Sequence, residues 1–328
     1  MPDRPERGRA RSSAGERSAR RRRPPSVELD FGEDAPAPRR DSRRESRGAV
    51  GREPGQRKPP PLIPQSGLAG RIIVAIPAAA IALAAILTTP EALAIFVLVV
   101  GAIAVHEFYA MTDHVHPVRI AGFLTLTALI AVGLWGGQFQ LVAVIAASFV
   151  VVFGFSAIAG AHENVTLGMA ATLFGAFWIG IPLAHAVWLK QLPHGEMIII
   201  NVLLGTFIGD TFAYGGGKLF GRNKMAPRLS PNKTWEGLII GMVGATLTVW
   251  FAGLYQDWIT GANALLLGFA VALAAPVGDL FESYIKRDFG VKDSGKAFGA
   301  HGGAMDRADA ALFTIVVGYY VWYSMAAL

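Results

Sequence analysis

The stretch FQLVAVIAASFVVVFGFSAIAG, Phe139 to Gly160, contains no charged side chain. The hydrocarbon core of a bilayer is about 30 Å thick and needs roughly 20 apolar residues from one α-helix. This stretch is therefore long enough to cross a membrane. The whole chain has 328 residues and is 52% hydrophobic and 16% charged, which is typical of a polytopic membrane protein. It contains no cysteine, which excludes disulfides and thiolate chemistry.

Eight further segments have similar length and apolarity, which predicts an all-α fold with about nine transmembrane helices. Glu107 interrupts the nearly charge-free first four segments, next to His106. We interpret these two residues as an interfacial polar pair rather than as metal ligands. The nine expected segments are 71–89, 91–111, 118–136, 139–160, 165–189, 197–217, 236–255, 262–285 and 308–327.

The first 67 residues differ in composition from the rest of the chain. They are rich in Arg, Pro, Ser and Gly, and 18 of the 30 Lys and Arg residues lie within residues 1–71. Such a segment buries too little apolar surface to offset its chain entropy, which predicts a disordered tail (1–67) before a membrane domain (68–328). Contact with anionic lipid headgroups and a merely solvated tail both fit, and we expect no nucleic-acid partner. The run Arg20–Arg23 is too far from the first apolar segment for a signal peptide.

The remaining basic residues predict the orientation of the chain in the membrane. Nine spans place the loops after the sixth and eighth segments on the same side as the tail. These two loops hold 10 of the 12 Lys and Arg residues that follow Arg71. Short cytoplasmic loops retain positive charge, so we expect the tail and both loops to be cytoplasmic and the C-terminus to be outside.

Two carboxylates lie inside apolar sequence, Asp210 in the sixth segment and Asp279 in the eighth. An ionisable side chain at that depth is unfavourable unless it is paired, bound to a cation or in a wet cavity, and it indicates function. Glu282, Ser283 and Lys286 follow Asp279 at helical spacing, so one face of the helix would present all four.

Asp306 and Asp309 lie one turn apart at the start of the ninth segment, after Gly302 and Gly303. Asp279 and Asp306 are therefore candidate ligands of one divalent cation. Carboxylates without His or Cys clusters favour Mg²⁺, and the neighbouring Lys and Arg would neutralise phosphate charge. The pattern predicts phosphoryl or nucleotidyl transfer in a polar cavity facing the cytoplasm. The sequence contains no P-loop motif.

Two long blocks carry a resemblance to a known family. SYIKRDFGVKDSGKAFGAHGGAMDRAD, Ser283 to Asp309, resembles the C-terminal signature of the phosphatidate cytidylyltransferases, the CDP-diacylglycerol synthases, in its polar residues and their spacing. GDTFAYGGGKLFGRNKMAPRLSPNKTWEG, Gly209 to Gly237, is similar to the other characteristic stretch. The resemblance covers approximately residues 68–328. It departs at Ala304 and Ala308, where the family usually has larger aliphatic residues.

The resemblance implies transfer of the cytidylyl group of CTP to phosphatidate, giving CDP-diacylglycerol and pyrophosphate for phospholipid biosynthesis. It implies a homodimer in the cell membrane, with Mg²⁺ at Asp279 and Asp306 and K⁺ as a candidate second cation. Ser283 and Lys286 match active-site positions and complete the catalytic set. The other candidate substrate-binding residues are Asp210, Lys233, Thr234, Arg287, Lys292, Asp293, Lys296, His301, Arg307 and Asp309.

Other classes of protein share part of this pattern. A CTP-dependent polyprenol kinase would give a different product, and a transporter of an anionic solute would move its substrate without turnover. A CDP-alcohol phosphotransferase would need a DGxxAR-type motif, which is absent. The segment SPNKT, Ser230 to Thr234, fits nucleotide contact and a loop ending in a helix N-cap equally well.

Overall fold

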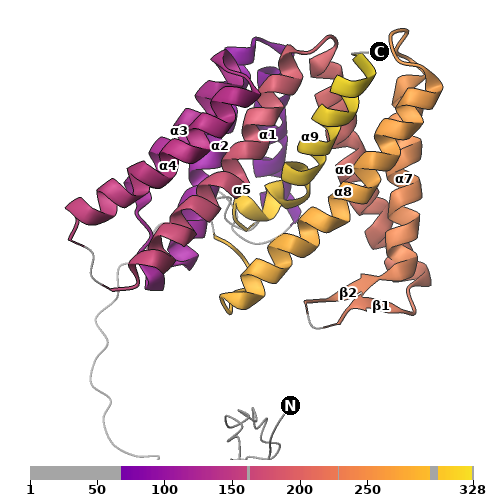
Figure 1. Cartoon of the computed structure of the whole chain (residues 1–328). Coiled ribbons are helices and arrows are strands. Elements are labelled where there is room, and N and C mark those ends of the chain that lie inside the picture. Colours follow the sequence, from indigo (N-terminus) through magenta and orange to yellow (C-terminus); the bar gives the residue numbers. More distant parts are fainter. Residues whose placement is uncertain (1–67, 161–162, 228, 296–301, 327–328) are drawn as a thin grey trace, which may run out of the picture. The chain divides into compact units, whose positions relative to one another are not determined.

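The computed structural model describes residues 68–160, 163–227, 229–295 and 302–326. The predicted disordered tail lies outside these residues. The described part forms nine α-helices, a short 3-10 helix and one two-stranded hairpin, so the all-α prediction omits the hairpin (Figure 1). The elements are α1 Leu68–Leu87, α2 Pro90–Met111, η1 Asp113–Val115, α3 Arg119–Trp135, α4 Gln138–Ile158, α5 Val165–Gln191, α6 Gly195–Phe220, β1 Lys224–Ala226, β2 Ser230–Thr234, α7 Trp235–Gly253, α8 Gly261–Asp288 and α9 Met305–Ala326.

The helices lie where the apolar segments predict them, within a few residues at each end. Among the described helices, α2, α4, α5, α6, α7 and α8 are long and apolar enough to cross a membrane. The apolar part of α1 and the whole of α3 are shorter. These lengths and compositions are those of a polytopic membrane protein, while nine membrane crossings remain a prediction.

Threonine side chains begin three of these helices. The Oγ1 atoms of Thr89, Thr234 and Thr260 each accept a hydrogen bond from a backbone N–H in the first turn of α2, α7 and α8, which satisfies a donor that has no partner within the helix. The N-cap interpretation of Thr234 is therefore confirmed. Its segment, however, is strand β2 rather than a loop.

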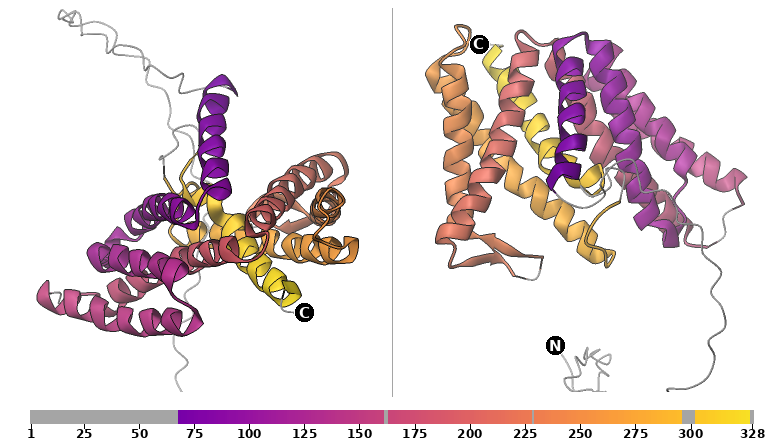
Figure 2. Two further views of the ribbon diagram at one scale, coloured as in Figure 1. Left: turned by 90° about the horizontal axis from the view of Figure 1, so that it is seen from above. Right: turned by 180° about the vertical axis from the view of Figure 1, so that it is seen from behind.

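The hairpin joins α6 to α7. Strands β1 and β2 are antiparallel, with Lys224 opposite Thr234. Its base is closed by Glu236 in the first turn of α7, whose carboxylate accepts hydrogen bonds from the backbone N–H of Arg222 at 3.1 Å and from Asn223 Nδ2 at 2.7 Å. The hairpin and the end of α8 lie at one end of the helical bundle, and the end of α9 lies at the other (Figures 1 and 2).

Helix α9 lies at the centre of the bundle. It packs against α2, α5, α6 and α8, and the view from above shows it between α2–α5 and α6–α8 (Figure 2). The large buried side chains include Phe108, Tyr109 and Leu126. The Tyr109 hydroxyl donates to the carbonyl of Thr172 at 2.7 Å, so this buried polar group has a partner. The start of α9 is consequently within reach of residues from both halves of the chain.

Small residues allow α6 and α7 to pack closely, as is common between membrane helices. A Cβ atom added at Gly241 would lie 2.6 Å from Ala213 Cβ and 2.9 Å from the carbonyl oxygen of Gly209. We therefore expect Gly241→Ala to destabilise the protein by about 1–3 kcal/mol through overpacking, measured as thermal unfolding in detergent. Gly154→Ala in α4 is the matched control, because a Cβ atom there meets nothing within 4 Å. Equal melting temperatures for the two variants would contradict the prediction.

Candidate active site

A polar cavity of about 600 Å³ lies between the end of α6, the hairpin, the start of α7 and α8. We call it the hairpin cavity. Its charged lining residues come from α6, β1, β2 and α8. They are Asp210, Lys218, Lys224, Lys233 and Asp279.

Lys233 on β2 and Asp279 on α8 form an ion pair in this cavity. Their side chains are 23% and 31% exposed, so the pair is only partly withdrawn from solvent. The carboxylate of Asp210 is close enough to interact with both charges. The cavity thus brings the block Gly209–Gly237 together with Asp279, which precedes the second block on α8.

A second charged group lies where α8 meets the start of α9. The Lys286 ammonium contacts Glu282 Oε2 at 2.6 Å and Asp306 Oδ1 at 2.8 Å. The Asp306 carboxylate also accepts hydrogen bonds from the backbone N–H groups of Ser294 at 3.1 Å and Gly303 at 2.8 Å. We call Glu282, Lys286, Ser294 and Asp306 the loop cluster. The Glu282 side chain is 1% exposed, so Lys286 provides the opposite charge that a buried carboxylate requires.

Helix α8 connects the hairpin cavity to the loop cluster, because Asp279 precedes Glu282 by one turn. The Asp309 carboxylate on α9 is close enough for its charge to interact with Asp279 and Asp210 of the hairpin cavity and with Lys286 of the loop cluster. Acidic and basic side chains therefore extend from β2 along α8 to α9.

The predicted cation shared by Asp279 and Asp306 stays a prediction. In the structure each of these carboxylates is paired with a different lysine. The described residues also contain no group of three His, Cys, Asp or Glu side chains placed to hold a metal ion. A cation bound by both carboxylates would have to replace or supplement these lysine contacts.

The other predicted residues are distributed around these two groups. Ser283 is half-buried on α8. Arg287 is exposed and donates to the carbonyls of Leu229, at 3.4 Å, and Val291, at 3.2 Å, so it connects the hairpin to the loop after α8. Lys292, Asp293 and Arg307 are exposed. Lys296 and His301 lie outside the described residues.

The interpretation of His106 and Glu107 as an interfacial pair is wrong for Glu107. His106 is exposed, whereas Glu107 is 6% exposed and contacts Ser294 and Met305. Successive helical residues point about 100° apart, so the two side chains lie on different faces of α2. The available signal was a carboxylate deep in the apolar sequence that follows Glu91.

Lys218 and Lys224 also line the hairpin cavity, although the sequence indicated them only as members of a basic loop. Ser294 belongs to the loop cluster and was not singled out from the sequence. Its position next to Asp293 and Gly295 in the signature block is the one feature that could have drawn attention to it.

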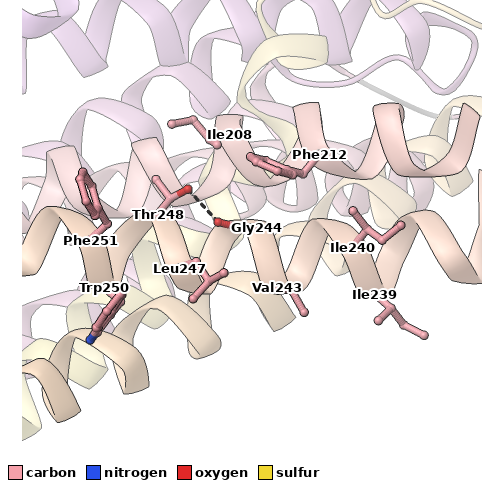
Figure 3. A pocket seen from close by; sticks show the side chains of 10 residues that line it. All are labelled: Ile208, Phe212, Ile239, Ile240, Val243, Gly244, Leu247, Thr248, Trp250 and Phe251. Atoms are coloured by element: carbon pink, nitrogen blue, oxygen red, sulfur yellow. Dashed lines mark hydrogen bonds between the residues drawn. The ribbon is translucent and has the colours of Figure 1, made fainter. Parts of the chain in front are cut away.

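A separate groove of about 640 Å³ on α6 and α7 has a different character (Figure 3). Its lining is almost entirely apolar and includes Phe212, Val243 and Leu247. The dashed line in Figure 3 is the hydrogen bond that Thr248 Oγ1 donates to the carbonyl of Gly244 at 2.7 Å, within one helix turn. The groove has no ionisable side chain in its lining, so it differs in character from the hairpin cavity.

Together these features define a polytopic helical membrane protein with a charged site at the helix ends. Residues 69–325 match the model of the cytidylyltransferase family. The chain therefore belongs to this family.

Individual relatives agree with this assignment. Phosphatidate cytidylyltransferase of Mycobacterium leprae is 36% identical over 161 residues, covering 48% of this chain and 50% of the relative. That of Thermotoga maritima is 42% identical over 134 residues, covering 39% of this chain and 50% of the relative. That of Rickettsia bellii is 35% identical over 156 residues, covering 45% of this chain and 68% of the relative. The chain spans about half the length of the first two of these relatives.

Proposed function

We propose that the protein is a phosphatidate cytidylyltransferase, which transfers the cytidylyl group of CTP to phosphatidate and releases pyrophosphate. The observation that carries this proposal is that α8 bears two neighbouring ion pairs, Asp279 with Lys233 and Lys286 with Asp306. The family match and the names of the relatives support the same reaction.

The reaction requires a lipid phosphate and a triphosphate to approach each other despite their like charges. An oxygen of the phosphatidate phosphate attacks the α-phosphorus of CTP, a new P–O bond forms, and the bond to the β-phosphate oxygen breaks as pyrophosphate leaves. Lys218, Lys224 and Lys233 line the hairpin cavity and would neutralise phosphate charge there. Lys286 would do so beside Asp306. No general base is needed, because a phosphate monoester is already ionised near pH 7.

The carboxylates fit a hard divalent cation in their chemistry. Asp210, Asp279 and Asp309 come from three helices and lie close enough for their charges to interact, and carboxylate oxygens are the ligands that Mg²⁺ prefers. We propose Asp279 and Asp306 as its protein ligands, with K⁺ as a candidate second cation. When bound, Mg²⁺ would stabilise negative charge on the triphosphate and on the departing pyrophosphate.

We also propose the finer features of localisation and assembly. Ten of the last 12 basic residues lie in the two loops that the positive-inside rule assigns to the cytoplasm. The tail and the active site would then be cytoplasmic and the C-terminus outside. The homodimer rests on family resemblance, and the mass of the detergent-solubilised protein, measured by light scattering, would test it.

The decisive experiment incubates the purified protein in detergent with labelled CTP, phosphatidate and Mg²⁺. We expect CDP-diacylglycerol and an equal amount of pyrophosphate, and no product when phosphatidate is replaced by diacylglycerol. Phosphorylation of a polyprenol instead would identify a kinase. Folded protein that forms no cytidylyl lipid with any divalent cation would refute the proposed reaction.

A further inference from the structure

Glu107 is a buried carboxylate in the first half of the chain that contacts the loop leading into α9. Its Oε2 atom accepts hydrogen bonds from Ser294 Oγ at 3.3 Å and from the backbone N–H of Met305 at 3.1 Å. These partners are 187 and 198 positions away in the sequence. Met305 is the first residue of α9, and a negative charge at a helix N-terminus is favourable.

The loop is shaped to approach this carboxylate. A Cβ atom at Gly295 would lie 2.3 Å from Glu107 Oε1, and one at Gly303 would lie 2.4 Å from Oε2 and 2.2 Å from Ser294 Oγ. No other residue type would fit at either position without movement. Both glycines therefore allow backbone to lie directly against the Glu107 side chain.

Ser294 connects Glu107 to the loop cluster. Its hydroxyl donates to Glu107, while its backbone N–H donates to both oxygens of Asp306, at 3.2 and 3.1 Å. Asp306 in turn holds the Lys286 ammonium. A continuous series of hydrogen bonds thus runs from α2 through the loop to α9 and α8.

We propose that Glu107, acting through Ser294, is a positioning residue that orients the Asp306 carboxylate and the start of α9 for the reaction. The kinetic test of this inference rests on the proposed function, because it measures the rate of that reaction. A packing role alone would be served by an apolar side chain, because the neighbourhood in α2 is apolar. A buried carboxylate is costly there unless it is hydrogen-bonded. Oε1 has no hydrogen-bond partner among the described residues. The hydrogen bonds of this carboxylate to Ser294 and Met305 are therefore both accepted by Oε2.

The test compares Glu107→Gln, Ser294→Ala and the double variant in the full-length protein. The amide can keep one oxygen at the Oε2 position but removes the negative charge that both donors face, and the alanine removes only the hydroxyl that connects Glu107 to Ser294. We expect each single change to lower kcat at least about 10-fold while KM for CTP and for phosphatidate stays within about threefold. The double variant should be no slower than the slower single variant, because both changes interrupt the same series of contacts.

Thr206→Val is the matched control. It also removes a buried hydroxyl that contacts α9, since Thr206 Oγ1 donates to Thr314 Oγ1 at 2.9 Å, but it lies away from the loop cluster. Its kcat should stay within about threefold of wild type. A comparable loss in the control, wild-type kcat in Ser294→Ala, or a loss that follows the melting temperature would overturn the proposal. If Glu107→Gln does not fold, Ser294→Ala decides alone.

Hydrogen exchange separates this inference from the proposed function. We expect faster exchange of the amides of Ser294, Gly303 and Met305 in Glu107→Gln than in wild type, with exchange in α4 unchanged. If the wild-type protein forms no CDP-diacylglycerol, the reaction fails, while this exchange difference still tests the Glu107 contact. Unchanged exchange at these three amides would overturn it.

Discussion

The Asp279→Asn variant is expected to fold like the wild type and to form CDP-diacylglycerol at least about 100-fold more slowly, the loss typical of removing one strong electrostatic contact from an active site. Asparagine keeps the size of the side chain and removes its charge. The Asp279–Lys233 pair is 31% and 23% exposed, and partly exposed ion pairs contribute only about 1 kcal/mol to stability. The expected defect is therefore in catalysis rather than in folding.

The measurement is the initial rate at increasing Mg²⁺ concentration, with the melting temperature of each variant determined in parallel. Glu196→Gln is the control, because it makes the same chemical change in a carboxylate that pairs with Lys190, away from the proposed site. Asp306→Asn should show a similar kinetic loss. Rates within threefold of wild type for both aspartate variants would keep the reaction and discard the metal assignment.

Lys286→Met is expected to destabilise the fold by about 3–5 kcal/mol, the cost typical of removing one partner of a buried ion pair, and to remove activity. Lys286 is the ion-pair partner of both Glu282 and Asp306, and the Glu282 side chain is 1% exposed. Methionine preserves much of the side-chain volume and removes the charge, so two carboxylates would face each other. The free energy of unfolding, or the melting temperature in detergent, measures the effect.

Two further variants separate the charge effect from the loss of any buried lysine. Lys190→Met removes a lysine that is 6% exposed but whose partner Glu196 is 37% exposed, so its cost should be smaller. Adding Glu282→Gln to Lys286→Met should recover part of the stability without recovering activity. Equal destabilisation by Lys190→Met and Lys286→Met would contradict the prediction that Lys286 stabilises the fold by neutralising the carboxylates of the loop cluster.

The helices could be predicted because a membrane span needs a long apolar run, and such runs are visible in one dimension. The hairpin was missed because it contains no such apolar run. Its strands are short and polar, and β2 begins with Ser-Pro, which is typical of a turn. Glu236 closes it through contacts to Arg222 and Asn223, and no local sequence pattern specifies those partners.

The site was predictable in its residue types but not in its pairings. Helical spacing placed Asp279, Glu282 and Lys286 on one face, yet in the structure this face divides between Lys233 on one side and Asp306 on the other. Glu107 shows the limit most clearly. Its segment is apolar on all sides, so periodicity could not indicate which neighbour its carboxylate meets, and the partners lie almost 200 positions away.

The contact between Glu107 and Met305 also sets an order of assembly during synthesis. At roughly 5–20 residues per second, a ribosome needs about 10–40 s to extend the chain from the first of these residues to the second. During that interval α2 carries a carboxylate whose hydrogen-bond donors do not yet exist. The nascent chain therefore completes the contact with Met305 only when α9 begins to emerge, and truncation before α9 would leave Glu107 without the Met305 donor.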